Sequence, residues 1–140
     1  PQTSKIRDIL GNGKVVLFGL PGAFTSTCSK LHLPGYVANA DKIKAKGIDN
    51  IFCLSVNDPF VMNAWGEANN AGNKITMLSD PYLLFTKAIG AGIDRNSKGM
   101  GTRSNRYAMV IENLEVINIQ VEKETKQCEL SSAIGILEQL

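Results

Sequence analysis

The chain has 140 residues, of which 44% are hydrophobic and 20% charged, and its net charge is +2 at pH 7. This size and composition predict one globular domain with one core, spanning residues 1–140. Cationic and anionic residues are interspersed along the chain, which argues against a nucleic-acid or anionic-membrane surface. No apolar run approaches the ~20 residues that cross a bilayer, and no basic-then-apolar leader begins the chain. We expect a soluble protein that acts on a small molecule or a protein.

Cysteine and histidine usage limits the compartment and the metal chemistry. The three cysteines, Cys28, Cys53 and Cys128, are too few and too far apart for a disulfide framework, and their odd number leaves a free thiol. We therefore expect a reducing intracellular compartment, either the cytoplasm or an organelle matrix such as that of a mitochondrion or plastid. His32 is the single histidine and no C-x-x-C pair occurs, so neither a metal site nor a cofactor is expected. Because position 1 is not Met, we expect a processed or trimmed chain.

The predicted elements alternate between strands and helices. Apolar, β-favouring runs predict buried strands, Gly47 predicts the end of the first helix, and Asp58 followed by Pro59 predicts the start of the second. Leu33-Pro34-Gly35 predicts an interruption of the first helix, because proline lacks an amide hydrogen. The predicted strands are 14–20, 51–56, 74–78, 106–111 and 116–121, and the predicted helices are 25–46, a segment beginning at 59, 82–89 and 131–140, with a loop at 90–101.

The order of these elements predicts an α/β fold. Three strand–helix units, a hairpin and a last helix give a mixed central sheet with helices on both faces. In the last helix, Ile134 and Leu137 are expected to face the core, with Leu140 as a third candidate. With a cysteine directly after the first strand, this order corresponds to the thioredoxin-like fold.

The segment Pro21-Gly-Ala-Phe-Thr-Ser-Thr-Cys28 places a thiol where the first strand passes into a helix. Thr25 and Ser26 are good helix-capping residues. The unpaired N–H groups and the positive dipole end of a helix start favour the ionised form of a cysteine in the first turn, and the thiolate is the nucleophile. The alternative is an inert, buried Cys28 that packs as a small hydrophobic residue.

A thioredoxin would carry a second cysteine three residues before the thiol of the first helix, and here that position is Thr25. Disulfide exchange within the helix is therefore excluded. A hydroxyl at this place can hydrogen-bond a thiolate or a substrate oxygen. A peroxide is the expected substrate of such a site.

Three blocks of the sequence resemble the peroxiredoxins. Pro21, Thr25 and Cys28 match the active-site pattern Pro-x-x-x-Thr-x-x-Cys, and the blocks together are similar to the type II (peroxiredoxin-5-like) subgroup. The resemblance implies a thiol peroxidase that reduces hydrogen peroxide and organic hydroperoxides. The matching blocks are 18–25, 53–65 and 101–109, within a likeness that runs over 14–140.

The resemblance also implies roles for individual residues. Cys28 would attack one peroxide oxygen and become a sulfenic acid, and Thr25 would hold the thiolate and the peroxide through its hydroxyl. Arg106 would stabilise the thiolate and the charge that moves along the O–O bond. Pro21 would shield the pocket from water, and backbone amides near Thr27 and Cys28 would bind peroxide oxygens.

Two of the site residues have alternatives. Arg106 could be a solvated charge at a strand end, and Arg103 is the competing arginine. His32 matches a histidine that follows the reactive cysteine of the family by four residues, one helical turn from Cys28. We expect a supporting or structural role for it.

The route by which the sulfenic acid is reduced stays open at this point. Cys53 follows Cys28 by 25 residues, as the second thiol does in plant-type relatives. A thiol inside an apolar strand run can reach Cys28 only if the active helix unwinds. Cys128 lies two residues before the place where animal-type relatives carry their resolving cysteine. We therefore expect a monothiol cycle, in which glutathione with glutaredoxin, or thioredoxin, attacks the oxidised sulfur.

Two further expectations follow from the resemblance. Relatives carry an extra pair of strands before the segment that corresponds to Lys14, so we expect the N-terminal strands to be trimmed or to lie outside this numbering. The subgroup forms homodimers through the face around the active-site loop, where Phe24 and Phe60 could form an apolar patch.

Two other classes of function remain open. A peroxide-sensing redox relay or chaperone-like binding protein would also need Cys28 but would show little turnover. An inert thioredoxin-fold interaction domain would make the joint presence of Pro21, Thr25, Cys28 and Arg106 a coincidence.

Overall fold

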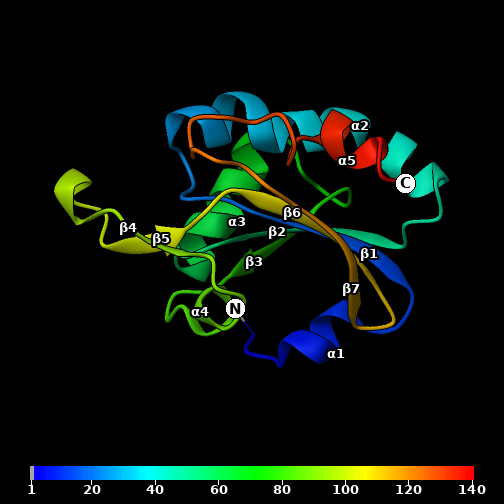
Figure 1. Ribbon diagram of the computed structural model, residues 1–140, viewed down its shortest axis with the longest axis horizontal. Helices are drawn as coiled ribbons and strands as arrows, with labels where there is room; N and C mark the ends of the chain where they lie inside the picture. Colours follow the sequence, from blue (N-terminus) through cyan, green and yellow to red (C-terminus); the bar gives the residue numbers. More distant parts are fainter. Residues whose placement is uncertain (1) are drawn as a thin grey trace.

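Five strands form one mixed sheet in the computed structural model, which describes residues 2–140 (Figure 1). These strands are β1 (Lys14–Gly19), β2 (Asn50–Ser55), β3 (Thr76–Ser79), β6 (Tyr107–Glu112) and β7 (Glu115–Val121). Their order in the sheet is β3-β2-β1-β6-β7, with β1, β2 and β3 parallel and β6 antiparallel to both of its neighbours. The central strand β1 is almost entirely buried, so its carboxyl end is a fixed point in the fold.

Helices cover both faces of the sheet. They are α1 (Ile6–Leu10), the π-helical turn η1 (Cys28–His32), α2 (Leu33–Ala45), α3 (Pro59–Ala68), α4 (Leu84–Ala88), the 3-10 helix η2 (Asn96–Lys98) and α5 (Ala133–Leu137). In Figure 1, α2 and α5 lie on one side of the sheet, and α1 and α4 lie on the other. Each side has its own apolar core, with Tyr36 and Trp65 in one and Ile6 and Phe85 in the other. No helix within residues 2–140 is long and apolar enough to cross a membrane.

This architecture confirms the predicted α/β, thioredoxin-like class, a mixed sheet with helices on both faces. Each of the five predicted strands is present, with boundaries within two residues of those expected. Asp58 caps α3 as predicted, because its side chain accepts a hydrogen bond from the amide of Val61 at 2.9 Å. Gly47, with φ +93°, ends the segment after α2.

The predicted interruption at Leu33-Pro34-Gly35 is wrong. The helix continues from η1 into α2, and Pro34 lies in the first turn of α2. Pro34 has no N–H to donate to the preceding turn, and it lies where the helical bonding changes from the π pattern of η1 to the α pattern of α2. The irregularity lies one turn earlier, where the amide of Leu33 donates to the carbonyl of Cys28 across the π-turn.

Short elements are absent from the prediction. The expected loop at 90–101 contains β4 (Gly92–Asp94), which pairs antiparallel with β5 (Thr102–Ser104). Neither β4, β5 nor the five-residue helix α1 is long enough to give a periodic signal.

The expected inner face of the last helix is only partly correct. Leu137 packs against the core, but Ile134 is 56% exposed, and the buried residues are Ala133 and Ile136. α5 has five residues and is capped by Ser132, and so short a helix does not define one face through its periodicity.

The carboxyl end of β1 approaches β6 closely. Gly19 is paired with Tyr107, and a Cβ at Gly19 would lie 2.3 Å from the Tyr107 ring. Only glycine fits there. This approach brings the loop after β1 to the same sheet edge as Arg106, which directly precedes β6.

Candidate active site

The loop after β1 is pinned to the end of β2. The amide of Ala23 donates to Oδ1 of Asn57 at 2.8 Å, and the Ser55 hydroxyl donates to the same oxygen at 3.0 Å. Phe24 then adopts a left-handed backbone conformation, φ 64°, which turns the chain toward the helix. These contacts fix the point at which the helix that carries Cys28 begins.

The start of this helix favours negative charge. The first intrahelical bond runs from the amide of Ser29 to the carbonyl of Thr25 at 2.9 Å. The amides of Ser26, Thr27 and Cys28 lie ahead of that bond, so the helix offers them no carbonyl acceptor. Their N–H groups and the positive end of the helix dipole stabilise an anion at the first turn. Cys28 is only 1% exposed there.

The guanidinium of Arg106 lies against the sulfur. Nη2 donates to Sγ of Cys28 at 3.1 Å, and Nε donates to the carbonyl of Thr125 at 2.9 Å. Arg106 is 2% exposed and has no carboxylate partner within residues 2–140. A buried, unpaired guanidinium is costly, and a thiolate at this distance would be its counter-charge. Arg103 instead donates through Nε to the carbonyl of Met100 at 2.8 Å, and its Nη1 lies beside Gly22.

His32 orients the guanidinium from its other side. Nη1 of Arg106 donates to Nδ1 of His32 at 2.8 Å, so Nδ1 carries no proton. Nε2 therefore carries the proton and donates to the carbonyl of Ser131 at 2.9 Å. Burial, and secondly the Arg106 charge, lower the pKa of His32 to about 3, although the Ser131 carbonyl opposes this shift. The imidazole is thus neutral at physiological pH.

The carboxylate of Glu122 holds the segment between β7 and α5 in place. This segment contains Thr125 and Ser131, whose carbonyls accept hydrogen bonds from Arg106 and His32. Glu122 accepts hydrogen bonds from the amide and the hydroxyl of Ser131, at 2.9 and 2.6 Å, and from the amides of Glu129 and Leu130, at 2.9 and 3.3 Å. Burial raises the pKa of Glu122, but these hydrogen bonds outweigh burial and lower the pKa below its usual range. The carboxylate therefore stays ionised and holds the segment in place.

Thr25 and Pro21 lie in the loop before the cysteine. The Thr25 hydroxyl donates to the carbonyl of Gly22 at 2.6 Å, and not to Cys28 as the resemblance implied. A hydroxyl has one proton, and the loop turns tightly enough to bring that carbonyl within its reach. The lone pairs of the Thr25 oxygen remain available to a substrate O–H. Pro21 is buried two residues after the end of β1.

The other two thiols are less favourably placed for reaction. All three cysteines are free. Cys53 is fully buried in β2, and burial, followed by the nearby Cys28, raises the pKa of its thiol well above the usual range. Cys128 is half-buried before α5, and burial raises the pKa of its thiol to about 11, with Arg106 opposing this shift. Neither environment activates a thiol.

The groups that hold Arg106 and His32 are missing from the sequence-based prediction. Thr125 and Ser131 act through backbone carbonyls, which no residue type reveals. For Glu122 the sequence offered one indication, which is its position directly after the last predicted strand. That strand pairs with the one that Arg106 precedes, and the amide of Glu122 donates to the Arg106 carbonyl at 3.0 Å.

This arrangement suits attack by sulfur on a small oxygen-containing molecule. The guanidinium and the first-turn amides are donors fixed where negative charge is held or develops. The Thr25 oxygen is an acceptor for a substrate proton. A thiolate in this setting can break an O–O bond and become a sulfenic acid.

Comparisons with known proteins agree with this chemistry. The redoxin family model matches residues 1–137. Peroxiredoxin-2D of Arabidopsis thaliana is 43% identical over 139 residues, which are 99% of this chain and 85% of the relative. The mitochondrial peroxiredoxin-2F of Oryza sativa is 38% identical over 139 residues, which are 99% of this chain and 70% of that one.

A solved structure is similar over nearly the whole chain. Reduced Prx3 from Vibrio vulnificus, in complex with H₂O₂, is 51% identical, with a TM-score of 0.90 over 96% of this chain and 86% of that chain. The chain therefore belongs to the redoxin family and is a peroxiredoxin of the type II (peroxiredoxin-5-like) subgroup, a thiol peroxidase.

Proposed function

We propose that Cys28 is the nucleophile with which this thiol peroxidase reduces hydrogen peroxide and alkyl hydroperoxides. The observation that carries the assignment is the 3.1 Å hydrogen bond from Arg106 to the Cys28 sulfur at a buried helix start. The guanidinium stabilises the thiolate before attack and the departing oxygen during it. Attack forms an S–O bond and breaks the O–O bond. Cys28 becomes a sulfenic acid, and the departing oxygen takes up a proton to give water or an alcohol.

Four further groups act on the substrate or on the arginine. Thr25 accepts a hydrogen bond from the peroxide O–H, since its own proton is donated to Gly22. The amides near Thr27 bind the peroxide oxygens, and Pro21 excludes water. His32 does not touch the substrate but positions the arginine.

The sulfenic acid is reduced by an external thiol, either glutathione with glutaredoxin or thioredoxin. A resolving thiol inside the chain would have to ionise and reach the sulfur of Cys28. The complete burial of Cys53 and the raised pKa values of Cys53 and Cys128 support a monothiol cycle instead.

The protein is proposed to act as a homodimer in a reducing compartment, the cytoplasm or an organelle matrix. Phe24 and Phe60 are 60% and 70% exposed, and exposed aromatic side chains of this kind are suited to a subunit contact. Thiol-dependent turnover needs a reducing supply, which such a compartment provides.

Peroxide consumption by the wild type and by Cys28→Ser, Cys53→Ser and Cys128→Ser tests these assignments. Each protein is measured with glutathione plus glutaredoxin and with thioredoxin, after circular dichroism has confirmed that it is folded. Only Cys28→Ser is expected to abolish turnover. A comparable loss in a folded Cys53→Ser protein would overturn the monothiol cycle, and a single slow oxidation without turnover would indicate a sensor.

A further inference from the structure

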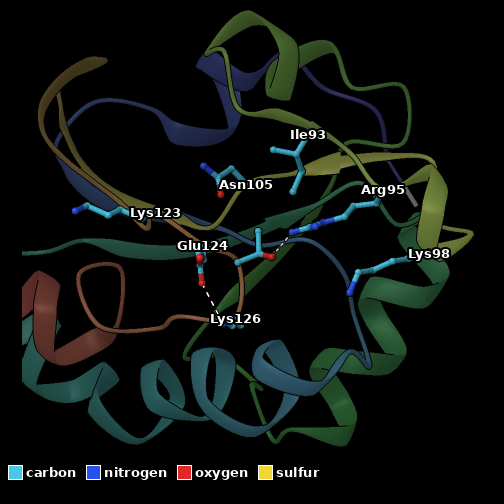
Figure 2. Close-up of a pocket in the computed structure, with 8 residues that line it drawn as sticks. Ile93, Arg95, Lys98, Asn105, Lys123, Glu124 and Lys126 are labelled. Atoms are coloured by element: carbon cyan, nitrogen blue, oxygen red, sulfur yellow. Dashed lines mark hydrogen bonds and ion pairs between the residues drawn. The ribbon is translucent and has the colours of Figure 1, made fainter.

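A cavity rimmed by cations lies beside the Cys28 site. Its volume is about 450 Å³, within the range of roughly 300 to 1,000 Å³ that is typical of small-ligand pockets. Arg95 and Lys98 come from the segment between β4 and β5, and Lys123 and Lys126 come from the segment after β7. Figure 2 shows Arg95 and Lys98 extending into the cavity, with Glu124 across from them.

The cavity concentrates the positive charge of the protein. Four cationic residues and one carboxylate, Glu124, line it, which leaves more positive charge here than the net +2 of the whole chain. In Figure 2, Lys123 points outward, away from Arg95 and Lys98. Glu124 pairs with Lys126 at 3.3 Å on the exposed rim. Within residues 2–140 no carboxylate pairs with Arg95, Lys98 or Lys123. Uncompensated cations around a concave surface attract an anionic ligand.

The cavity shares a wall with the active site. Thr125 lines the cavity, and its carbonyl accepts the Nε–H of Arg106 at 2.9 Å. Lys126 also lines it, and its carbonyl accepts the hydroxyl proton of Thr27 at 3.4 Å. The side chain of Asn105, a third lining residue, accepts the backbone amide of Arg106 at 2.8 Å. A ligand in the cavity is therefore one residue away from the groups that contact Cys28.

We propose that this cavity binds the carboxylates of an anionic, low-molecular-mass thiol such as glutathione and presents its sulfur to oxidised Cys28. The inference rests on the proposed peroxidase cycle and names the site of its reductant. Glutathione carries two carboxylates and one ammonium group, which match the excess of cations and the single Glu124 carboxylate. Carboxylates form strong, charge-assisted hydrogen bonds with Arg and Lys. The same cations favour the thiolate form of the bound ligand.

The reaction that follows is balanced without a further reagent. The ligand thiolate attacks the sulfur of the Cys28 sulfenic acid, an S–S bond forms, the S–O bond breaks, and the hydroxide takes up a proton to leave as water. The Cys28 sulfur is reduced and the ligand sulfur is oxidised. Because Cys28 is 1% exposed, the first helical turn must open for this contact, and the π-turn at Cys28–His32 is where regular helical bonding is already interrupted.

Binding is tested with S-methylglutathione, which keeps the charges of glutathione but cannot form a disulfide. Calorimetry and backbone amide shifts of the full chain are recorded at low ionic strength for the wild type, Lys98→Glu and Lys74→Glu. Lys74 is the matched control, because it is exposed and precedes β3, at the sheet end opposite to Cys28. Lys98→Glu is expected to weaken binding about tenfold, and Lys74→Glu to leave it unchanged.

Reaction is tested by oxidising Cys28 with peroxide and following the mixed disulfide by mass spectrometry. Glutathione is compared with its diethyl ester, in which both carboxylates are blocked. Lys98→Glu is expected to slow the reaction with glutathione about tenfold, while the reaction with the ester and the initial oxidation of Cys28 keep their wild-type rates.

Three results would overturn the assignment of this cavity. They are undetectable binding of S-methylglutathione, equal slowing of glutathione and its ester, and slowing confined to glutaredoxin or thioredoxin, which would make the surface a protein-docking site. If Cys28 forms no sulfenic acid at all, the proposed function fails, yet the S-methylglutathione measurement still decides whether the cavity binds the thiol.

Discussion

Glu122 accepts both the amide and the hydroxyl proton of Ser131, at 2.9 and 2.6 Å. The carbonyl of the same serine accepts the Nε2 proton of His32, whose Nδ1 in turn accepts from Arg106. A carboxylate that does not contact Cys28 therefore sets the position of the guanidinium that does.

Glu122→Gln is expected to weaken both the fold and the site. The glutamine amide would turn an NH₂ group toward backbone N–H donors, leaving buried donors unpaired, so the free energy of unfolding should fall by about 1 to 3 kcal/mol. Oxidation of Cys28 by peroxide should slow as His32 and Arg106 lose their support. Chemical denaturation and stopped-flow oxidation measure the two effects.

Glu124→Gln is the matched control for this change. Glu124 lies two residues away and is exposed, and in the described part of the chain its carboxylate pairs only with exposed Lys126. Pairs of this kind contribute about 0 to 1 kcal/mol. Equal effects of the two substitutions would contradict the positioning role of Glu122.

The residues proposed to react are easier to predict from the sequence than the groups that hold them in place. Cys28 and Thr25 lie in a recognisable motif, and Arg106 lies in another, because each role demands one residue type. The supports of Arg106 are mostly backbone carbonyls, which any residue can provide. Their location depends on how the segment after β7 folds back over the helix, and that path leaves no periodic pattern.

The neutrality of His32 predicts a pH dependence of stability. The pKa of His32 is about 3 in the folded protein and 6.5 ordinarily. Below pH 6.5 the unfolded chain binds a proton that the folded chain rejects, so stability falls as the pH is lowered through this window. Between pH 6.5 and about 5, this group should remove about 2 kcal/mol.

Chemical denaturation of the wild type and His32→Gln at pH 6.5 and at about pH 5 measures this loss in the free energy of unfolding. Glutamine can accept from Arg106 and donate to Ser131 but does not titrate, so the variant should lose much less stability on acidification. The same loss in both proteins would show that His32 is not the group responsible.

The Thr25 hydroxyl is expected to act as an acceptor held by Gly22. Thr25→Ser keeps the donor to the Gly22 carbonyl and the lone pairs, so it should retain most of the peroxidase activity. Thr25→Val keeps the shape but removes both, and kcat/KM for peroxide should fall by about tenfold to a hundredfold. Equal activity of the two variants would contradict the proposed role of the Thr25 hydroxyl in peroxide binding.

Helices and strands can be predicted from the sequence where they are long and apolar. β1 and β2 are continuous buried runs, and Asp58 with Pro59 marks the start of α3. The π-turn at Cys28–His32 and the β4–β5 pair depend on contacts with distant segments. Local propensity does not specify them.

The most direct test of the central claim is the rate at which peroxide oxidises Cys28 in wild type, Arg106→Lys and Arg103→Lys. Trp65 reports on the reaction, since its Nε1 donates to Oγ of Ser29, the neighbour of Cys28, at 3.0 Å. The single Nζ of lysine cannot take the places of the three guanidinium nitrogens that contact Cys28, His32 and Thr125. Arg106→Lys should therefore slow oxidation about a hundredfold, while Arg103→Lys stays within about twofold of wild type. A wild-type rate in Arg106→Lys would contradict the claim that this guanidinium activates the sulfur.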